Sequence, residues 1–350
     1  MITIKEIAEM MNVSPTTVAN VIHGRTNKVS KENVERIQKA LKDYNYVPRM
    51  GLESLTKGKS RIILVVAHLT RKYSLTYLSD PFFGYIVGVM EEIISNAGYY
   101  MMLYINKENK DITSTAMSWN VAGIITITFS CKNFKKLSAL ADCPIVGIDT
   151  YGSPEELKEG HHVKLDDAEA GRLMARYLIS RGFKNIITIA DDADVQKGSS
   201  LERMDGIHEV LKEYHLPCSH PGIPDIIYLD PLDIHSYAKL DQLFPFAGQN
   251  YVLFCTSDQF AFSIIGYLTR QGMRVPEDFS VCGFDDNAYA SFSNPQLTTV
   301  HQDIKKKAET ALDILFSLIA GKDIEDCITY LPVKIIPRNS TQICNKDNDH

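Results

Sequence analysis

From Arg61 onward the chain alternates short apolar runs with longer amphipathic segments, and this alternation restricts the possible folds more than any other feature. Eight runs have the length and composition of strands, and apolar residues recur at helical spacing between them. Strands that are apolar throughout are buried on both faces, which predicts parallel sheets covered by helices. The predicted strands are RIILVVA, YMMLYI, AGIITIT, PIVGID, KNIITIA, DIIYL, YVLFC and FSVCGF.

The length of this region predicts two lobes. Roughly 280 residues of alternating pattern exceed one comfortable sheet, so we expect two doubly wound α/β lobes with a ligand between them, at the carboxyl ends of the strands. The polar segment TYGSPEELKEGHH is the predicted first crossing between the lobes. The main predicted helices run from Phe82 to Ala97, Asp167 to Arg181, Glu202 to Tyr214 and Asp258 to Gln271.

The first 48 residues follow another pattern, of short helices with marked ends. Thr3 and Glu6 have capping-box spacing, and the apolar residues that follow predict a helix from Ile4 to Met11. Ser14 is a second N-cap, and Pro15 stands at the first helical position, where its missing N–H costs nothing. Two short helices joined by a tight turn are typical of a helix-turn-helix, whose second helix faces base edges in the major groove.

The second helix, predicted to end near Ile22, carries more hydrogen-bonding side chains than its core contacts need. Val18 and Val21 would be buried with Ile22. Thr16 and Asn20 are four residues apart and share a face; Thr suits several bases or a thymine methyl, and Asn can bond adenine N6 and N7 together. We therefore expect these two residues to choose the DNA sequence. A third helix would complete the core with the cap and apolar stripe Ser30, Val34, Ile37, Leu41 and Tyr44.

Charge divides the chain in the same place. Residues 1 to 60 contain ten Lys and Arg against six Asp and Glu, a balance of +4, which leaves −10 for residues 61 to 350 of a chain with net charge −6. A basic head on an acidic body suggests that the head meets a polyanion, although an excess of this size also arises by chance.

Cysteine usage and hydropathy indicate the compartment. The seven cysteines form no Cys-x-x-Cys pair and their number is odd, which favours reduced, mostly buried thiols over disulfides or a zinc site. The N-terminus has no apolar run of signal-peptide length, and no later segment reaches eighteen apolar residues. We therefore expect a cytoplasmic protein with no membrane partner, and we predict no cofactor and no metal.

Several motifs have two interpretations. The segment RMGLESLTKGKS ends in GKS, as a phosphate-binding P-loop does. Its glycine spacing does not match that motif, and it precedes a strand, so we interpret it as a hinge. Asp285 and Asp286 suggest either a general-acid pair or a ligand-binding Asp285 beside a structural Asp286. Arg203 either binds ligand or pairs with a helix neighbour such as Glu202 or Asp205. A metal site at His161, His162, Asp166 and Asp167 is the alternative to a solvated loop. No catalytic triad order or Gly-x-Ser-x-Gly elbow stands out, so we predict that the chain is not an enzyme.

Taken together, these segments resemble the lactose-repressor (LacI/GalR) family of bacterial transcription regulators over essentially the whole chain to Arg338. The head segments TIKEIAEMMNVSPTTVANVI and VSKENVERIQKALKDYNYVP are similar to the family's signature and third helix, and SLTKGKS to its hinge end. The resemblance implies a helix-turn-helix domain at 1–48, a hinge at 49–60, a two-lobed periplasmic-binding-protein-like effector domain at 61–338 and a disordered tail at 339–350. The body segments that carry it are DPFFGYIVGVMEEIISNAGY, VAGIIT, DDAEAGRLMARYLISRGFKNI, LERMDGI, TSDQFAF, GFDD and LTTVHQD.

The resemblance also implies roles for single residues. The base-reading positions are Pro15, Thr16 and Asn20. The positions that contact phosphate or base edges are Ser14, Thr17, His23 and Ser30, and Thr3, Lys28 and Lys57 complete the predicted DNA-binding set. Leu55 matches the hinge leucine that wedges into the minor groove and kinks DNA. A small molecule, commonly a sugar or nucleobase, would bind in the cleft at Phe82, Phe83, Asp149, Arg203, Asp258, Asp285 and Gln302. Of the two phenylalanines, we expect one in the core and one lining the cleft.

Departures from the family pattern qualify these expectations. Leu52 and Glu53 stand where Ala-Arg is usual, and Ser257 replaces a frequent Asn. No leucine-heptad helix follows Arg338, so the resemblance implies a homodimer without tetramer formation. We expect a repressor that binds pseudo-palindromic double-stranded operator DNA and responds to a small molecule, which we expect to be a sugar; whether the ligand induces or co-represses stays open. The alternatives are a sugar-binding protein or an enzyme built on the same two-lobe fold.

Overall fold

A computed structural model describes residues 3–22, 24–44, 60–68, 76–106, 112–191, 198–217 and 223–342. The chain divides into two compact units, Met1–Ser60 and Arg61–His350. The predicted hinge lies almost wholly outside the described residues.

The first unit is a three-helix domain, as the capping signals predict. Its core is formed by small and branched apolar side chains from all three helices: Ile7, Ala8, Val18, Val21, Ile37 and Ala40. Thr3 and Glu6 form the complete capping box. Tyr44, predicted on the apolar stripe, instead caps the third helix and is 51% exposed. The elements are α1 (Ile4–Met11), α2 (Pro15–Ile22), the 3-10 turn η1 (Thr26–Lys28) and α3 (Lys31–Asp43).

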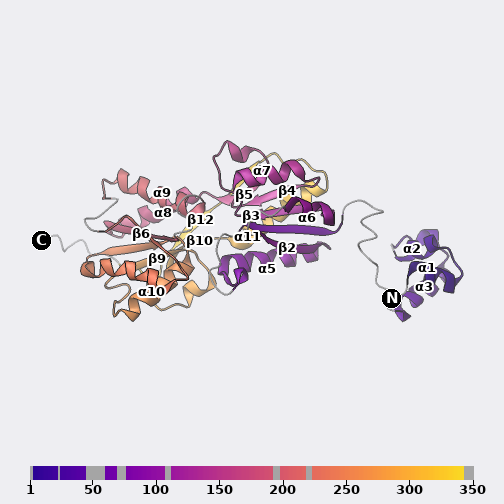
Figure 1. The fold of residues 1–350 in the computed structure, drawn as a ribbon, viewed down its shortest axis with the longest axis horizontal. Helices are drawn as coiled ribbons and strands as arrows, with labels where there is room; N and C mark the ends of the chain where they lie inside the picture. The colour runs from indigo at the N-terminus through magenta and orange to yellow at the C-terminus, as the bar shows by residue number, and fades with distance from the viewer. Residues whose placement is uncertain are drawn as a thin grey trace. The chain divides into compact units, whose positions relative to one another are not determined.

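The second unit contains two six-stranded sheets, each between layers of helices (Figure 1). The first sheet has the order β11-β5-β4-β3-β1-β2 and all its pairings are parallel. Figure 1 shows α6 and α7 on one side of it and α5 on the other, where α11 also packs. The strands are β1 (Ile62–His68), β2 (Tyr100–Asn106), β3 (Gly123–Ile127), β4 (Ile145–Ile148), β5 (His161–Leu165) and β11 (Ile328–Leu331). The helices are η2 (Tyr77–Ser79), α5 (Pro81–Asn96), α6 (Ile112–Trp119), α7 (Cys131–Leu140), η3 (Glu156–Lys158) and α11 (Ile304–Ile319).

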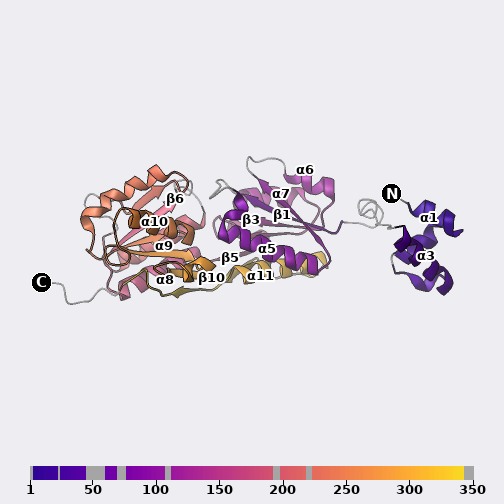
Figure 2. The same cartoon turned by 90° about the horizontal axis from the view of Figure 1, so that it is seen from below.

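The second sheet has the order β12-β10-β9-β8-β6-β7, and only β12 runs antiparallel to its neighbour. Its two faces are covered by α8 with α9 and by α10 with η5; Figure 1 shows α8 and α9 on one side of the sheet and α10 on the other, and Figure 2 gives the same ribbon turned by 90°. The strands are β6 (Asn185–Asp191), β7 (Ile226–Leu229), β8 (Tyr251–Cys255), β9 (Ser280–Asp285), β10 (Thr298–Gln302) and β12 (Val333–Ile336). The helices are α8 (Asp167–Ser180), α9 (Ser199–Glu213), η5 (Ile234–Phe246), α10 (Asp258–Arg270) and η6 (Ala288–Ser291).

The chain passes from one lobe to the other three times, after β5, after β10 and after β11. The predicted first crossing at residues 150–162 is wrong, because this segment stays in the first lobe and its last two residues begin β5. The crossing follows at Asp166. Strand β5 was not predicted because its sequence contains polar residues. The side chains of two of them, His162 and Lys164, are nevertheless buried.

The carboxyl-terminal boundary also differs from the prediction. Residues 339–342, predicted as the start of a tail, pack on the second lobe. The Ser340 hydroxyl accepts the Thr298 N–H at 2.8 Å and donates to the Val281 carbonyl at 2.6 Å, and Thr341 bonds the Thr298 hydroxyl at 2.8 Å. These hydroxyls satisfy polar groups at the sheet, which holds the segment in place. Residues 343–350 lie outside the described part of the chain.

Two further features bear on the sequence predictions. Five of the seven cysteines lie within the described residues and all five are free thiols, with Cys131, Cys255 and Cys282 buried. Across those same residues, no helix has the length and apolar character needed to span a membrane.

Candidate functional site

The amino-terminal turn of α2 presents polar side chains to solvent. Ser14 accepts the Thr17 N–H at 3.1 Å, and the two hydroxyls lie 2.8 Å apart, so Ser14 is the predicted N-cap. Ser14, Pro15 and Thr16 are exposed, whereas Asn20 is half-buried on the following turn. The buried Val18 and Val21 fix the opposite face of the helix. This is the arrangement that a helix needs to enter a groove by its first turns.

The remaining predicted DNA-binding residues are spread over the same small domain. Thr3 and Ser30 are exposed N-caps of α1 and α3, and Lys28 is exposed at the end of η1. N-caps place the hydroxyl beside free backbone N–H groups, which suits contact with phosphate. His23, Leu55 and Lys57 lie outside the described residues.

In the second unit, predicted cleft residues meet at the carboxyl ends of strands from both lobes. Asp149 follows β4 with a φ of 49°, while Asp285 ends β9 with a φ of 120°. Gln302 ends β10 and donates to Asp285 Oδ1 at 2.6 Å. The positive φ of both aspartates is uncommon for residues with a side chain and marks constrained turns at this edge.

Lys307 joins these groups and was missed by sequence reasoning. Its ammonium donates to Asp149 Oδ1 and Oδ2 at 2.8 and 2.9 Å and to Gln302 Oε1 at 2.8 Å. It is only 1% exposed and lies 5.4 Å from the centre of the Phe82 ring. A continuous polar chain thus runs from Asp149 in the first lobe through Lys307 and Gln302 to Asp285 in the second.

Arg203, predicted to bind the effector, is 8% exposed and held by three contacts. Its Nε donates to Asp167 Oδ1 at 2.9 Å, and its NH1 donates to the Thr256 carbonyl at 2.7 Å. The guanidinium carbon lies 3.4 Å from the centre of the Phe284 ring. The ion-pair partner is therefore Asp167 on α8, and neither of the helix neighbours considered from the sequence.

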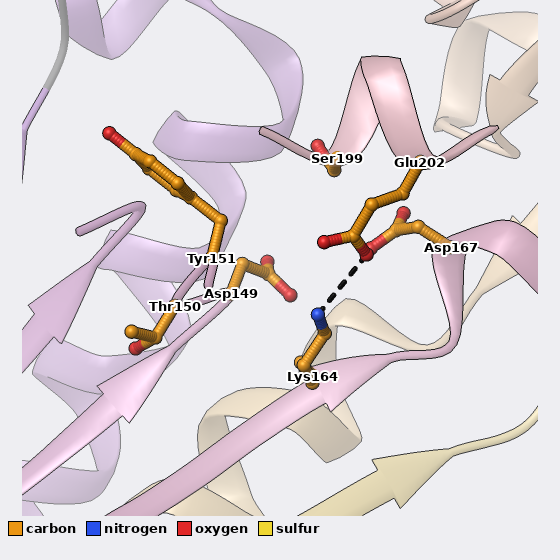
Figure 3. A pocket seen from close by; sticks show the side chains of 7 residues that line it. All are labelled: Asp149, Thr150, Tyr151, Lys164, Asp167, Ser199 and Glu202. Atoms are coloured by element: carbon orange, nitrogen blue, oxygen red, sulfur yellow. Dashed lines mark hydrogen bonds and ion pairs between the residues drawn. The ribbon is translucent and has the colours of Figure 1, made fainter. Parts of the chain in front are cut away.

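A small pocket lies between the lobes beside these residues (Figure 3). About 170 Å³ of space free of protein atoms lies in it, part of which is open to solvent. Lys164 of β5 and Glu202 of α9 form an ion pair across it at 3.2 Å, and the Asp149 carboxylate points toward that pair. Of the lining residues only Asp149 was predicted from the sequence. The lining consists of Asp149, Thr150, Tyr151, Lys164, Asp167, Ser199 and Glu202.

Two predicted effector residues are enclosed by protein. Phe83 is 2% exposed in the core of the first lobe, whereas Phe82 is half-buried, so the expected division between core and cleft places Phe82 on the open side. Asp258 is fully buried: Oδ1 accepts the Thr299 hydroxyl at 2.6 Å and Oδ2 the Asn287 N–H at 2.9 Å. With both oxygens occupied, Asp258 supports the loop after β9 and has no surface for a ligand.

Asp286, the neighbour of Asp285, is held by two basic side chains of the second lobe. It pairs with Arg338 and, at 2.9 Å, with His301 Nδ1. This geometry agrees with the interpretation of a structural Asp286 and leaves no general-acid pair.

Burial changes the proton affinity of the cleft acids. It raises the pKa of Asp285 to about 7, against the lowering effects of Arg203 and Gln302. It also raises the pKa of Asp258 well above its usual range and raises those of Asp80 and Asp167. For Lys164, burial disfavours the charge, but Glu202 and Asp167 outweigh it and the pKa is raised. Titratable groups with such shifts gather at functional sites.

The two adjacent histidines have separate environments. His162, predicted in a solvated loop, is fully buried; its Nδ1 lies 3.1 Å from the Thr150 hydroxyl and its ring packs 4.4 Å from that of Phe134. Burial lowers the pKa of His162 to about 4, which keeps it neutral at pH 7. His161 instead bonds the Asp326 carbonyl at 3.1 Å. Over the described ranges no group of three or more His, Cys, Asp and Glu side chains could hold a metal.

Comparison with known protein families identifies both units. Residues 3–49 match the family described as bacterial regulatory proteins, lacI family, and residues 175–341 match the periplasmic binding protein-like domain. The transcriptional repressor PurR of Vibrio atlanticus is 28% identical over 99% of this chain and 100% of its own length. PurR of Haemophilus influenzae is 27% identical over 96% of each chain.

Solved structures share the same fold. The Lac repressor dimer bound to operator and the anti-inducer ONPF has a TM-score of 0.79 at 21% identity, covering 97% of this chain and 99% of that one. The complex of the transcriptional regulator CelR with cellobiose has a TM-score of 0.67 at 23% identity, covering 97% and 100%. At these identities the likeness shows a common architecture of helix-turn-helix and two α/β lobes.

Proposed function

This chain belongs to the lacI family of bacterial regulatory proteins. We propose that it is a cytoplasmic transcription repressor and that a small molecule bound between its two lobes controls its affinity for operator DNA. Relatives named as transcriptional repressors match it over nearly the whole chain. The proposal assigns DNA recognition to the first unit and ligand sensing to the second.

The observation that carries the DNA-binding part is the exposed first turn of α2. Thr16 is exposed and Asn20 lies one turn further on the same face, while the buried valines anchor the helix. Asn can bond adenine at two positions and Thr can approach several bases, so these two side chains supply the choice of sequence. Exposed Ser14, Ser30 and Lys28 supply sequence-independent contacts to phosphate.

The effector part rests on the polar chain at the strand ends. The four residues Asp149, Lys307, Gln302 and Asp285 come from both lobes. They bring carboxylate, ammonium and amide groups together, and groups of this kind bind a polyhydroxy compound. We propose a sugar as the first class of effector. One of the similar structures is a complex with cellobiose.

A homodimer completes the proposal. Tyr289 lies in η6 and is 62% exposed, and Phe292 follows η6 and is 83% exposed. Together they form an apolar surface that a second copy of the chain would cover. A twofold dimer presents two recognition helices and therefore fits a pseudo-palindromic operator.

The test begins with selection of the operator by the full-length protein from a random duplex library. The selected sites should be pseudo-palindromic. Thr16→Ala and Asn20→Ala should each lower affinity for the selected site by about 1 to 3 kcal/mol and relax specificity at particular base pairs. Lys28→Ala should weaken binding to all sequences alike. An Asn20→Ala variant that retains both affinity and base preference would remove α2 from sequence recognition.

The coupling to an effector has its own test. Sugars are screened for stabilisation of the protein against heat, and each hit is tested for a change in operator affinity. Arg203→Ala should abolish that change, because its guanidinium joins Asp167, a residue that lines the pocket, to the end of β8. A retained response would exclude Arg203 from the effector site.

A further inference from the structure

Lys164 and Glu202 form an ion pair that connects the two lobes of the second unit. Lys164 lies in β5 of the first sheet, whereas Glu202 lies in the first turn of α9, which packs on the second sheet. The Lys164 ammonium donates to Glu202 Oε2 at 3.2 Å. The Lys307–Asp149 pair, by contrast, stays within the first lobe. The Lys164–Glu202 pair is therefore placed to influence how the lobes are arranged.

The charge of Lys164 depends on carboxylates of the other lobe. Its side chain is 7% exposed, and burial by itself would lower the pKa of the ammonium. Glu202 and Asp167, both of the second lobe, oppose that effect, and the pKa of Lys164 is raised. A buried ammonium is stable only beside such partners. The contact between the lobes therefore keeps this lysine charged, and the charged lysine in turn attracts the second lobe.

Separation of the lobes would expose this pair to water. Both residues line the pocket between the lobes, Figure 3 shows the pair crossing it, and the Glu202 side chain is already 32% exposed. Once the lobes part, both charges would be hydrated, so the pair can break at modest cost. A pair broken inside one lobe, such as Lys307–Asp149, would leave a buried charge instead. A modest and reversible interaction is the kind that shifts a balance between two arrangements.

The position of the pair in the pocket wall also connects it to ligand binding. A ligand that fills the pocket would contact both Lys164 and Glu202, one from each lobe. Its hydroxyl groups could accept a hydrogen bond from the ammonium and donate one to the carboxylate, which are the bonds that the two residues make with each other. Occupation of the pocket and formation of the pair are therefore coupled.

We propose that Lys164 and Glu202 form a latch between the lobes, which favours the arrangement described here over arrangements in which the lobes lie further apart. The latch consists of protein groups alone, so it biases the lobes before any ligand binds. Its effect on DNA rests on the proposed function, in which the arrangement of the lobes controls operator affinity. The latch itself is a property of the second unit and can be tested without DNA or ligand.

The distance between the lobes tests the latch directly. In full-length protein, a ketone-bearing amino acid replaces the exposed Lys136 of α7 and Lys212 of α9, which belong to different lobes, and each ketone receives a spin label. Pulsed electron paramagnetic resonance gives the distance distribution, with labelled protein diluted into unlabelled protein to suppress distances between copies. The buffer is at about pH 8, which favours ionised Glu202, since burial raises the pKa of that carboxyl. Lys164→Met and Glu202→Gln should each broaden the distribution.

Glu209→Gln is the matched control on the same helix. Glu209 accepts a hydrogen bond from Arg172 at 2.8 Å, but α8 and α9 both belong to the second lobe, so separation of the lobes leaves this pair intact. Circular dichroism checks that each variant is folded, and the control should keep the distribution of the unaltered protein. A distribution that Glu202→Gln leaves unchanged overturns the latch. Equal broadening in Glu202→Gln and Glu209→Gln also overturns it, because the cause would then be a general effect of charge.

Operator affinity, measured with no ligand added, separates the latch from the function beneath it. Lys164→Met and Glu202→Gln change the net charge in opposite directions, yet both break the latch, so both should shift operator affinity in the same direction by about threefold. The double variant should shift it no further, since no pair is left to break. Opposite shifts would trace the effect to net charge and overturn the latch as a regulator. Broadened distances with unchanged operator affinity would support the latch and contradict the proposed control of DNA binding by the lobes.

Discussion

Lys307 carries much of the charge balance in the cleft, since it is the only described base in contact with Asp149. Its ammonium reaches both carboxylate oxygens and the Gln302 amide, and its side chain is 1% exposed. Water cannot replace these bonds in so enclosed a place. The ion pair is therefore costly to break from one side, although the pair as a whole need add little to stability.

Lys307→Met should destabilise the second unit by about 3 to 5 kcal/mol, because it leaves Asp149 charged, buried and without its partner. Urea unfolding followed by circular dichroism measures the loss. Lys306→Met is the matched control, since the neighbouring side chain is 57% exposed and should change stability by less than about 0.5 kcal/mol. Equal midpoints for the two variants would mean that Asp149 does not need a cation.

The same residue shows where prediction at residue scale stops. The sequence has three consecutive lysines at 305–307. Only the rotation of α11 about its axis determines that Lys307 is the one that points into the cleft. Ser14 and Pro15 could be predicted because capping chemistry is local and depends on three or four consecutive residues. Partners such as Asp167 for Arg203 depend on packing between helices, which no short pattern contains.

At the scale of elements, the contact of α8 with α9 places Arg203 beside Asp167. Gly171 and Gly206 allow this close approach: a Cβ on Gly171 would lie 2.1 Å from the Arg203 carbonyl oxygen, and one on Gly206 would lie 2.0 Å from that of Ala168. Both obstacles are backbone atoms, so neither can move aside by rotation of a side chain. Glycine here serves packing and thereby the site.

Gly206→Ala should force the two helices apart, cost about 2 kcal/mol or more of stability and weaken the Arg203–Asp167 pair, with loss of the effector response. Thermal unfolding and effector titration of operator binding measure both effects. Gly266→Ala is the control in α10, where the new methyl would lie 3.6 Å from the Arg270 guanidinium and better helix propensity should leave stability equal or slightly higher. A harmless Gly206→Ala would contradict the packing argument.

The elements themselves were predictable to differing degrees. Strands such as YVLFC can be predicted from the sequence, because both of their faces are buried and every residue is apolar. Strand β5 was not predicted because its sequence, HHVKL, contains polar side chains. These side chains form hydrogen bonds with residues far away in the sequence: His162 with Thr150 and Lys164 with Glu202. Buried polar side chains are expected near a site, and there the pattern of apolar letters fails.

At the scale of the whole second unit, the three crossings between lobes lie at one side. β5 and β11 are neighbours in the first sheet and β10 and β12 in the second, so the connections that follow β5, β10 and β11 are adjacent. Such a bundle of short connections allows one lobe to turn against the other, as in hinge closure around a ligand. A ligand that binds one arrangement of the lobes better than another can then shift operator affinity.

The proposed homodimer can be tested at the same scale through Phe292. This side chain is 83% exposed, and covering it in a twofold interface would contribute about 1.5 to 3 kcal/mol from each copy. Phe292→Asp should therefore weaken the dimer by at least about a hundredfold. Because a monomer holds only one half-site, operator affinity should fall with it.

Sedimentation equilibrium and operator titration of Phe292→Asp measure the two losses together. Tyr214→Asp is the control, an aromatic of the same lobe that is 48% exposed at the end of α9, and it should stay dimeric. If Phe292→Asp dimerises as the unaltered chain does, the subunits meet through another surface. If it becomes monomeric but keeps its operator affinity, the pairing of two recognition helices is not what gives the repressor its strength.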